Sequence, residues 1–389
     1  MYYALLNEYI YCVVRSVGMK SLIKWPGGKA REIKHIEGMI PSFDRYVEPF
    51  FGGGAMFFFL KPKNALINDI SNNLMDFYEL AKRQDEEFKG YLLTYHKLMT
   101  NLVECCDEKY DAIKMVYVAM KKSYIGEDAA KNMVSEIVKD VLAWAYDCEI
   151  GKVVLDAGEL EGHVVRAVIN KLKRTIKNET KSQYTSEDLK ENLITGFTSG
   201  LYMYFRDIYN KLTLGKLENQ TKAYRIANFY FIREYCYGSM FRYNKYGEFN
   251  IPYGGMSYNR KDFKGKIEEI FSKNVFEILR NTSIHKKDFA DFIEIAELTE
   301  KDFMFLDPPY DTEFSDYEGL EFSKADQKRL SEVLEKTKAR FILIIKNTEY
   351  IHSLYNGKFK ILEFDKQYTY NVRSRNDRNT EHLIITNIE

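Results

Sequence analysis

One stretch of the chain decides the expected fold: Val47-Glu48-Pro49-Phe50-Phe51-Gly52-Gly53-Gly54. Residues 45–48 have the pattern of a short buried strand, and a helix is predicted from Ala55. Glycines between a strand and a helix allow positive φ angles and let a ligand approach the backbone closely. The stretch therefore favours a ligand-binding loop in an α/β domain, although a simple glycine turn has the same pattern.

Further strands and helices alternate around this loop. Residues 64–68 predict a second strand, and a helical pattern resumes at Ser71. Four more strands are expected near the other end of the chain, at 303–306, 341–345, 359–364 and 382–386, with a helix over 324–335. Alternating strands and helices indicate a mostly parallel sheet with helices on both faces. We therefore expect one α/β domain built from residues 19–80 and 275–389.

The middle of the chain has a different pattern. No proline occurs between residues 63 and 251, and apolar residues recur at helical spacing in 111–124 and 162–177. We therefore expect an inserted, mainly helical domain over residues 81–274. The basic residues of 162–177 lie largely opposite its apolar ones, as on a solvated helix face or on a helix that contacts phosphates.

Composition narrows the class of protein. The hydrophobic content of 45% supports a buried core, and no run of about 18 apolar residues predicts a membrane span. Residues 1–18 carry Glu8 and lack a basic start, so we expect an N-terminal extension rather than a signal peptide. Five cysteines and six histidines without paired ligand spacing indicate a cytoplasmic protein and no metal site. The net charge of zero argues only weakly against a nucleic-acid partner, since a local basic face is enough.

A second candidate site follows the strand predicted at 303–306. Leu306-Asp307-Pro308-Pro309-Tyr310 places a carboxylate, two prolines and an aromatic ring at the edge of the sheet where α/β proteins bind ligands. The prolines fix φ, and the Pro308 carbonyl remains available to accept a hydrogen bond. Asp307 and this carbonyl can both accept from a planar amino group, on whose ring Tyr310 can stack. The alternative is a plain Pro-Pro turn at the end of a strand.

Two segments near the first loop carry candidate binding residues. Asn68-Asp69-Ile70 ends the second strand with an acidic residue, which commonly binds ribose hydroxyls and otherwise caps a helix. Lys24-Trp25-Pro26-Gly27-Gly28-Lys29 precedes a helix expected over 30–39 and offers an apolar ring and an amine. The alternative for this second segment is a glycine turn with a solvated lysine.

A last segment, residues 241–252, alternates basic, aromatic and amide side chains around Gly247, as a hairpin would. Arg and Asn are the side chains that read guanine and adenine edges, and Tyr can wedge into a base stack. An ordinary polar surface hairpin would show the same residues.

In this order, the segments resemble the Dam-type (alpha-group) DNA adenine methyltransferases. The family motifs K-W-x-G-G-K, E-P-F-x-G-x-G, an N/A-D-I-N-like segment, R-Y-N-x-x-G-x-F-N-x-P and D-P-P-Y correspond to residues 24–29, 48–54, 68–71, 242–252 and 307–310. The resemblance covers both ends of the chain and leaves out most of residues 85–225. One departure is Tyr237-Gly238-Ser239-Met240, where the family has Tyr-Asn-Gly-Leu.

The resemblance implies an α/β fold, namely a Rossmann-like AdoMet-dependent methyltransferase domain whose helical insert is a target-recognition domain ending in a hairpin. Residues implied to hold the cofactor S-adenosyl-L-methionine are Trp25, Lys29, Glu48, Pro49, Gly52, Gly54, Asp69, Asp288, Phe289 and Asp307. In the family the counterpart of Asp69 binds the ribose. Asp288-Phe289 is the best match to a pair beside the cofactor's adenine.

The implied activity is methyl transfer to the exocyclic amine of an adenine flipped out of double-stranded DNA. Catalytic residues would be Asp307, Pro308, Pro309 and Tyr310, and DNA-binding residues Lys24, Tyr237, Arg242, Asn244 and Lys245. Tyr237 corresponds to the family's intercalating aromatic residue, and we expect the 242–252 hairpin to overhang the catalytic pocket. No metal and no covalent intermediate are expected.

Other functions fit these residues less well. Methylation of the cytosine amine usually uses Ser where Asp307 stands, while methylation of an RNA adenine remains open. A catalytically silent DNA-binding module has no use for intact Gly52–Gly54, Asp69 and 307–310, and a dehydrogenase would need G-x-G-x-x-G. The resemblance suggests a prokaryotic or phage-encoded enzyme, acting with a cognate restriction endonuclease or in epigenetic marking.

Overall fold

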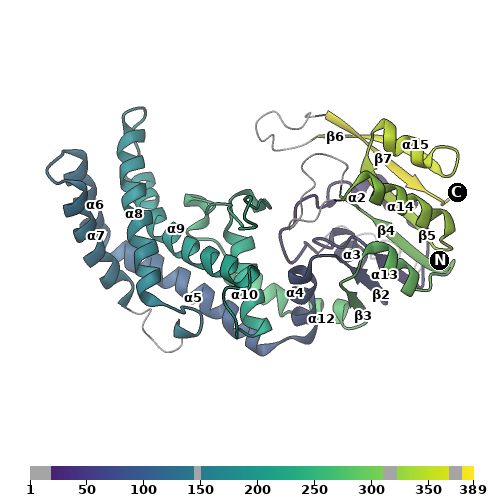
Figure 1. The fold of residues 1–389 in the computed structure, drawn as a ribbon, viewed down its shortest axis with the longest axis horizontal. Coiled ribbons are helices and arrows are strands. Elements are labelled where there is room, and N and C mark those ends of the chain that lie inside the picture. The colour runs from purple at the N-terminus through teal and green to yellow at the C-terminus, as the bar shows by residue number, and fades with distance from the viewer. Residues whose placement is uncertain (1–18, 144–149, 310–321, 368–378) are drawn as a thin grey trace, which may run out of the picture. The chain divides into compact units, whose positions relative to one another are not determined.

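The computed structural model describes residues 19–143, 150–309, 322–367 and 379–389. These divide into two compact units. One unit holds the described residues up to Arg83 together with Lys273–Glu389, and the other is Gln84–Ser272. The first unit contains the labelled strands, and the second is built of helices (Figure 1).

The first unit is organised around a seven-stranded sheet in the order β3-β2-β1-β4-β5-β7-β6. The strands are β1 (Arg45–Glu48), β2 (Ala65–Asn68), β3 (Thr282–His285), β4 (Asp302–Leu306), β5 (Arg340–Lys346), β6 (Lys360–Gln367) and β7 (Asn379–Thr386). Strands β1 to β5 pair in parallel, whereas β7 runs antiparallel to both of its neighbours. This is the mostly parallel sheet that the alternating pattern predicted.

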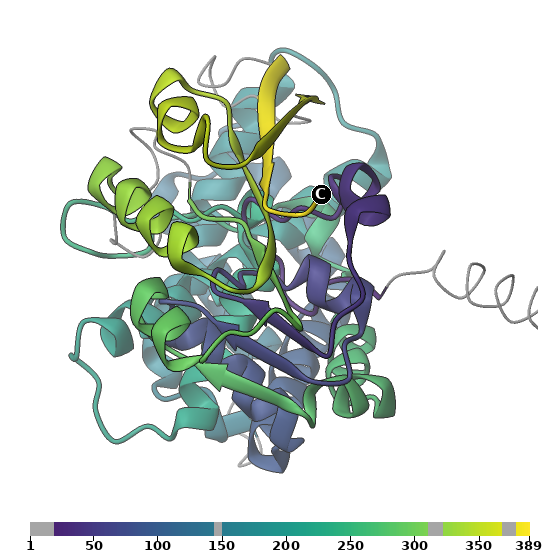
Figure 2. The ribbon, with the colours of Figure 1, turned by 90° about the vertical axis from the view of Figure 1, so that its right-hand side faces the viewer.

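Helices cover both faces of this sheet (Figure 2). They are α2 (Ile33–Ile36), α3 (Ala55–Leu60), α4 (Asn72–Arg83), α12 (Lys273–Leu279), α13 (Phe289–Ile295), α14 (Lys324–Lys336) and α15 (Glu349–Tyr355). Alternate strand residues such as Val47 and Leu343 pack in one core with Leu330 of α14. On the other face the ring of Tyr46 lies 6.3 Å from that of Phe57 in α3. Burial on both faces explains why β4 and β5 are almost continuously apolar.

The strand order reverses between β1 and β4. From β1 the chain proceeds to β2 and β3 on one side, while β4 leads to β5 on the other. Loops that leave the carboxyl ends of two such strands diverge, and the crevice between them is where open α/β sheets bind ligands. Strand β1 ends at Glu48 and β4 at Leu306, so the glycine loop and the Asp-Pro-Pro segment both begin at this crevice.

The structure differs from the sequence predictions at three places in this unit. The helix expected over 30–39 is wrong: a four-residue helix, α2, is followed by a 3-10 turn at Glu37–Met39. The Lys29 carbonyl accepts from the backbone N–H groups of both Glu32 and Ile33, so the chain turns tightly before it becomes helical. Strand β3 was missed because Ile284 is its one strongly apolar residue, and helix α13 because it is short.

The second unit consists mainly of helices, and the residues between α10 and α11 form a long connection with little regular structure. They are α5 (Glu86–Glu108), α6 (Tyr110–Lys121), α7 (Glu127–Val141), α8 (Ala157–Glu179), α9 (Ser186–Thr213), α10 (Lys222–Tyr235) and α11 (Phe263–Ile270). As predicted, α8 buries Val164, Val168 and Leu172 and exposes basic residues. One of those basic residues, Lys173, forms an ion pair of 2.5 Å with Glu127, as on a solvated helix face. Among the described residues, no helix is long and apolar enough to cross a membrane.

Helices α8 and α9 pack unusually closely because of two glycines. A Cβ atom on Gly196 would lie 3.1 Å from the Cα of Val168, and one on Gly200 would lie 2.5 Å from the Cα of Val164. Both contacts involve backbone atoms, which cannot move away as a flexible side chain can. The distance between the two helices therefore depends on the absence of these side chains.

We expect Gly200→Ala to lower the free energy of unfolding by about 1–3 kcal/mol, because the new methyl group forces α8 and α9 apart. Gly162→Ala in α8 is a matched control, since no atom lies within 4 Å of its Cβ position. That control should raise stability by about 0.5–1 kcal/mol through helix propensity. Urea unfolding followed by circular dichroism measures both. Equal midpoints for Gly200→Ala and wild type would contradict the packing argument.

Candidate active site

A cavity of about 300 Å³ lies at the carboxyl ends of β1 and β4. Its walls come from residues 25–29, 48–56, 68–71, 287–289 and 307–309, together with Phe305, Phe322 and Asp326. It brings together most of the residues selected from the sequence, namely Trp25, Lys29, Glu48, Pro49, Gly52, Gly54, Asp69, Asp288, Phe289, Asp307, Pro308 and Pro309. Tyr310 lies outside the described residues, and the side chain of Lys24 is exposed beside the cavity-lining Trp25.

The loop after β1 depends on glycine at two positions. Gly52 and Gly54 have φ angles of 50° and 65°, in the left-handed region that disfavours other residues. A Cβ atom on Gly52 would lie 2.9 Å from Cδ1 of Trp25, and one on Gly54 would lie 2.5 Å from Cζ of Phe51. The loop therefore packs directly against the Trp25 ring, and this contact joins residues 48–54 to residues 24–29.

Asp69 is held by the loop that it faces. One oxygen, Oδ2, accepts from the backbone N–H of Gly52 at 2.9 Å, and Oδ1 accepts from that of Ser71 at 3.0 Å. Burial raises the pKa of Asp69, although these backbone N–H groups act in the opposite direction. Asp69 thus holds the turn before α4 and lines the cavity, whereas the N–H of Leu74 in the first turn of α4 donates to the Ser71 hydroxyl at 3.4 Å. The alternative interpretation of Asp69 as the helix cap is therefore wrong.

Asn68, which the sequence analysis did not select, connects three segments of the site. Its amide donates to the carbonyls of Pro49 at 3.1 Å and Lys287 at 3.0 Å, and its oxygen accepts from the N–H of Lys287 at 2.8 Å. The side chain is 1% exposed. Asn68 therefore fixes the glycine loop to the segment that leads into α13, and only the structure reveals these partners.

Lys29 and Asp307 form an ion pair inside the site. The Lys29 side chain is 3% exposed, and its amine also donates to the Gly27 carbonyl at 3.1 Å. The solvated-lysine alternative is therefore wrong. A buried ammonium group is tolerated because a carboxylate compensates its charge, and Lys29 in turn favours the ionised form of Asp307.

Glu48 has the opposite environment. Burial raises the pKa of its carboxyl well above the usual range, and the negative charges of Asp307 and Asp69 raise it further. The hydroxyl of Tyr46 donates to Glu48 at 2.8 Å, which opposes this shift without cancelling it. Two carboxyl groups of the same cavity, Glu48 and Asp307, thus have contrasting surroundings.

An aromatic wall completes the cavity. The rings of Phe50, Phe289 and Phe322 lie 5.4 to 5.6 Å from one another. Asp288 begins α13 by accepting from the N–H of Ala290, and it also accepts from Arg329 at 2.7 Å. Phe50 and Phe322 were not singled out from the sequence. Apolar rings beside a few fixed carboxylates suit a purine nucleoside, which has a flat ring and several hydroxyl or amine donors.

The candidate DNA-binding residues of the second unit lie on or beside one turn. The backbone pairs Tyr243 with Phe249 and Cys236 with Tyr253 through isolated bridges, so the predicted hairpin is present but short. Arg242 is exposed and donates to Asn250 at 2.7 Å, while Lys245 is exposed on the same turn. Tyr237 is 52% exposed.

Asn244 is used within this turn. Its side-chain oxygen accepts from the N–H groups of Tyr246 and Glu248, and its amide donates to the Glu248 carboxylate at 2.9 Å. Such bonding is typical of an Asx turn. A base contact by Asn244 remains a prediction.

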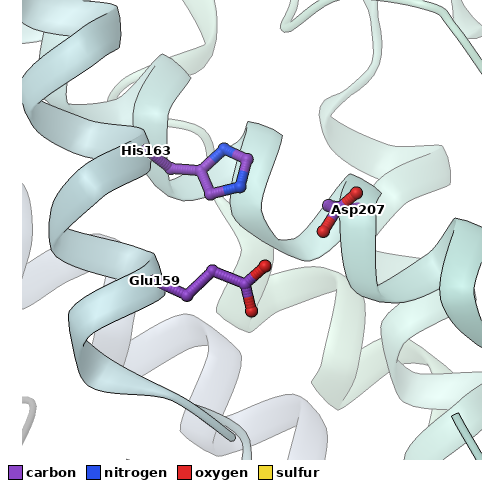
Figure 3. Close-up of side chains that lie close together, drawn as sticks. All are labelled: Glu159, His163 and Asp207. Atoms are coloured by element: carbon purple, nitrogen blue, oxygen red, sulfur yellow. The ribbon is translucent and has the colours of Figure 1, made fainter.

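A separate cluster of metal-binding side chain types lies between α8 and α9. Glu159, His163 and Asp207 offer ligand atoms that are all within 4.8 Å of one another (Figure 3). The amine of Lys211 bonds to Glu159 at 2.6 Å and to Asp207 at 2.9 Å. Since this ammonium group already pairs with both carboxylates, we interpret the cluster as an ion-pair network that joins the helices.

The sheet order and a nucleoside-sized cavity at the strand-order reversal define an α/β methyltransferase fold of the AdoMet-dependent kind. The model of the D12 class N6 adenine-specific DNA methyltransferase family matches residues 25–144 and 164–370. The chain therefore belongs to this family. The expectation that most of residues 85–225 lie outside the resemblance is wrong, because within that range only residues 145–163 are unmatched.

Several named relatives agree with this assignment. The Type II methyltransferase M.CviBI of Paramecium bursaria Chlorella virus NC1A is 25% identical over 95% of this chain and 100% of its own length. The Type II methyltransferase M.MjaIII of Methanocaldococcus jannaschii is 24% identical over 87% and 89%. A DNA adenine methylase of Vibrio cholerae is 21% identical over 92% of both chains. The chain is thus a DNA adenine methyltransferase, as the sequence predicted.

We expect Glu48→Gln to stabilise the folded protein at neutral pH. Because folding raises the pKa of Glu48, both states hold the proton below about pH 4, and the folded state becomes disfavoured as the pH rises above the unfolded value. Glutamine removes this cost, so the gain should grow from acidic to neutral pH.

Asp302→Asn is the control of opposite sign for this measurement. Burial alone would raise the pKa of Asp302, but hydrogen bonds from Arg45 and Thr299 lower it overall. Its contribution to stability is therefore present at neutral pH and lost in acid. Thermal unfolding of both variants from about pH 2 to 8 tests the pair, since the Asp302 contribution is lost below about pH 4 and the Glu48 cost appears above it. A pH-independent effect of Glu48→Gln would contradict the assigned burial cost.

Proposed function

We propose that the cavity binds S-adenosyl-L-methionine and that Asp307 and the Pro308 carbonyl receive the exocyclic amine of an adenine flipped out of double-stranded DNA. The observation that carries this proposal is the position of Asp307. It follows the last residue of β4, lines the cavity and is paired with a buried lysine. No metal ligand is needed for this chemistry.

The residues of the cavity fit the proposed cofactor. Asp69 keeps lone pairs available beyond its two backbone donors, which suits ribose hydroxyls. Phe289 and the neighbouring rings offer a surface for the adenine base, and Asp288 lies next to them. When bound, the cofactor supplies an electrophilic methyl group on its sulfonium. The carboxylates of the cavity complement that positive charge.

The protein's part in the reaction is to position and polarise the target amine. The amine's lone pair is delocalised into the adenine ring, so the free base is a poor nucleophile. Two acceptors, Asp307 and the Pro308 carbonyl, hold its N–H bonds and direct the lone pair toward the methyl group. Lys29 keeps Asp307 ionised and fixed before the base arrives, which avoids reorganisation during the reaction.

The second unit would supply target recognition. Arg242, Lys245 and Tyr237 are exposed on or beside one turn, where they can reach base edges, phosphates or a base step. We further propose a role in marking or protecting DNA in a prokaryotic or phage setting. The Type II names of several relatives support a cognate restriction endonuclease as partner.

We expect Asp307→Ala to reduce methyl transfer on the order of 10²-fold or more, because it removes the charged acceptor for the amine. Asp69→Ala is the contrasting variant and should weaken AdoMet binding by roughly 1.5–3 kcal/mol through loss of charge-assisted hydrogen bonds. Single-turnover methylation and calorimetric titration of AdoMet separate the two effects. Activity of Asp307→Ala within a few-fold of wild type would exclude the proposed role.

We expect Arg242→Ala to relax discrimination at one position of the target site by roughly 1–3 kcal/mol, the range for an arginine that reads guanine. Lys245→Ala, on the same exposed turn, is the control and should slow methylation of all sequences alike, as loss of a phosphate contact does. Rates on duplexes with each single base change measure both. A uniform loss for Arg242→Ala would show that Arg242 does not read a base.

A further inference from the structure

Gln327 of α14 is a buried polar residue that lies outside the cavity. Its side chain is completely buried, and its amide nitrogen donates to the carbonyl of Pro309 at 2.9 Å. Its amide oxygen is also buried and has no hydrogen-bond partner among the described residues. A buried amide with an unsatisfied oxygen lowers the stability of the folded protein, which points to a functional reason for its hydrogen bond to Pro309.

The Asp307-Pro308-Pro309 turn cannot hold itself in place through its backbone. The parallel pairing of β4 with β5 ends at Leu306, which is opposite Leu343. Pro308 and Pro309 have no N–H groups, so neither can be anchored by donating to a neighbouring strand. Any hydrogen bond that fixes this part of the turn must therefore be donated to its carbonyls by another segment.

The prolines nevertheless restrict most of the turn's torsions. Each ring fixes its own φ angle, and each residue that precedes a proline is confined to extended ψ values. The prolines therefore restrict ψ of Asp307 and of Pro308, and the turn is stiff. The prolines leave φ of Asp307 free, and rotation about it would swing the whole turn. Gln327 holds the far end of the turn through the Pro309 carbonyl.

We propose that Gln327 is a positioning residue for methyl transfer. By holding the Pro309 end of the stiff turn, it prevents rotation about φ of Asp307 and so keeps the Asp307 side chain and the Pro308 carbonyl in register with the target amine. Gln327 does not line the cavity and touches neither cofactor nor base. The inference rests on the proposed catalytic role of Asp307 and adds a residue from a different element of the fold.

The test is Gln327→Met, which keeps the approximate length of the side chain but cannot donate. The matched control is Ser331→Ala, one helical turn further along the same buried face of α14. Ser331 is 1% exposed, and its hydroxyl donates to the Leu354 carbonyl at 3.2 Å, away from the turn. Both variants remove one buried hydrogen bond of α14, but only Gln327→Met releases the catalytic turn.

We expect Gln327→Met to lower the single-turnover rate by about 10-fold to 10²-fold, the range for misplacement of a reacting group by about 1 Å. Its AdoMet and DNA dissociation constants should stay within about threefold of wild type, and Ser331→Ala should keep its rate. A rate within twofold of wild type for Gln327→Met, while Asp307→Ala is inactive, would overturn the inference. Equal rate losses in Gln327→Met and Ser331→Ala would also overturn it, because stability would then explain both.

Gln327→Glu provides a second measurement, the pH dependence of the methylation rate. A purely structural role for Gln327 would not predict this pH dependence. Its carboxyl group can donate to Pro309 only when protonated, so the rate relative to wild type should rise as the pH is lowered. The same ratio for Ser331→Ala should be flat. A flat ratio for Gln327→Glu would count against the proposal, and an active Asp307→Ala would remove the proposed function on which it rests.

Discussion

The parallel pairing of β1 with β4 is the constraint on which the rest of the catalytic unit depends. It joins segments that are far apart in the chain, with Tyr46 opposite Phe303, and Arg45 reinforces it through two hydrogen bonds to Asp302 of 2.8 and 2.9 Å. Because the strand order reverses at this pair, the glycine loop and the Asp-Pro-Pro turn leave the sheet on either side of one crevice. Without this pairing, Asp69 and Asp307 would have no common cavity to line.

Within that cavity, three carboxyl groups differ because of their surroundings rather than because of their residue type. Glu48 is buried beside two other carboxylates, so its neutral form is favoured, whereas Asp307 faces the ammonium group of Lys29. Burial raises the pKa of Asp69, and hydrogen bonds from backbone N–H groups oppose that shift. The proposed cationic cofactor would therefore meet carboxyl groups with different surroundings, and among the described residues the one paired with a buried lysine is Asp307.

The sequence was sufficient for the features that have local causes. Strands β1, β4 and β5 were predicted within one or two residues, because buried parallel strands are apolar throughout, and the glycine and proline motifs were placed correctly. It was insufficient where long-range contacts decide. Asn68 and Gln327 act through partners distant in the chain, Phe322 joins an aromatic wall assembled from three segments, and β3 is recognisable as a strand only beside β2. The late start of α2 likewise follows from the tight turn at Lys29.

The same architecture explains how the helical unit can be inserted into the first unit at little cost. Helix α4 ends at Arg83 where the helical unit begins, helix α12 starts at Lys273 where it ends, and these two helices contact each other within the first unit. The chain thus leaves and re-enters the catalytic unit at neighbouring places. Since the entropy of closing an inserted segment grows only slowly with its length, insertions between these points cost the first unit little. The residues that line the cavity can therefore keep their positions whatever the length of the inserted unit.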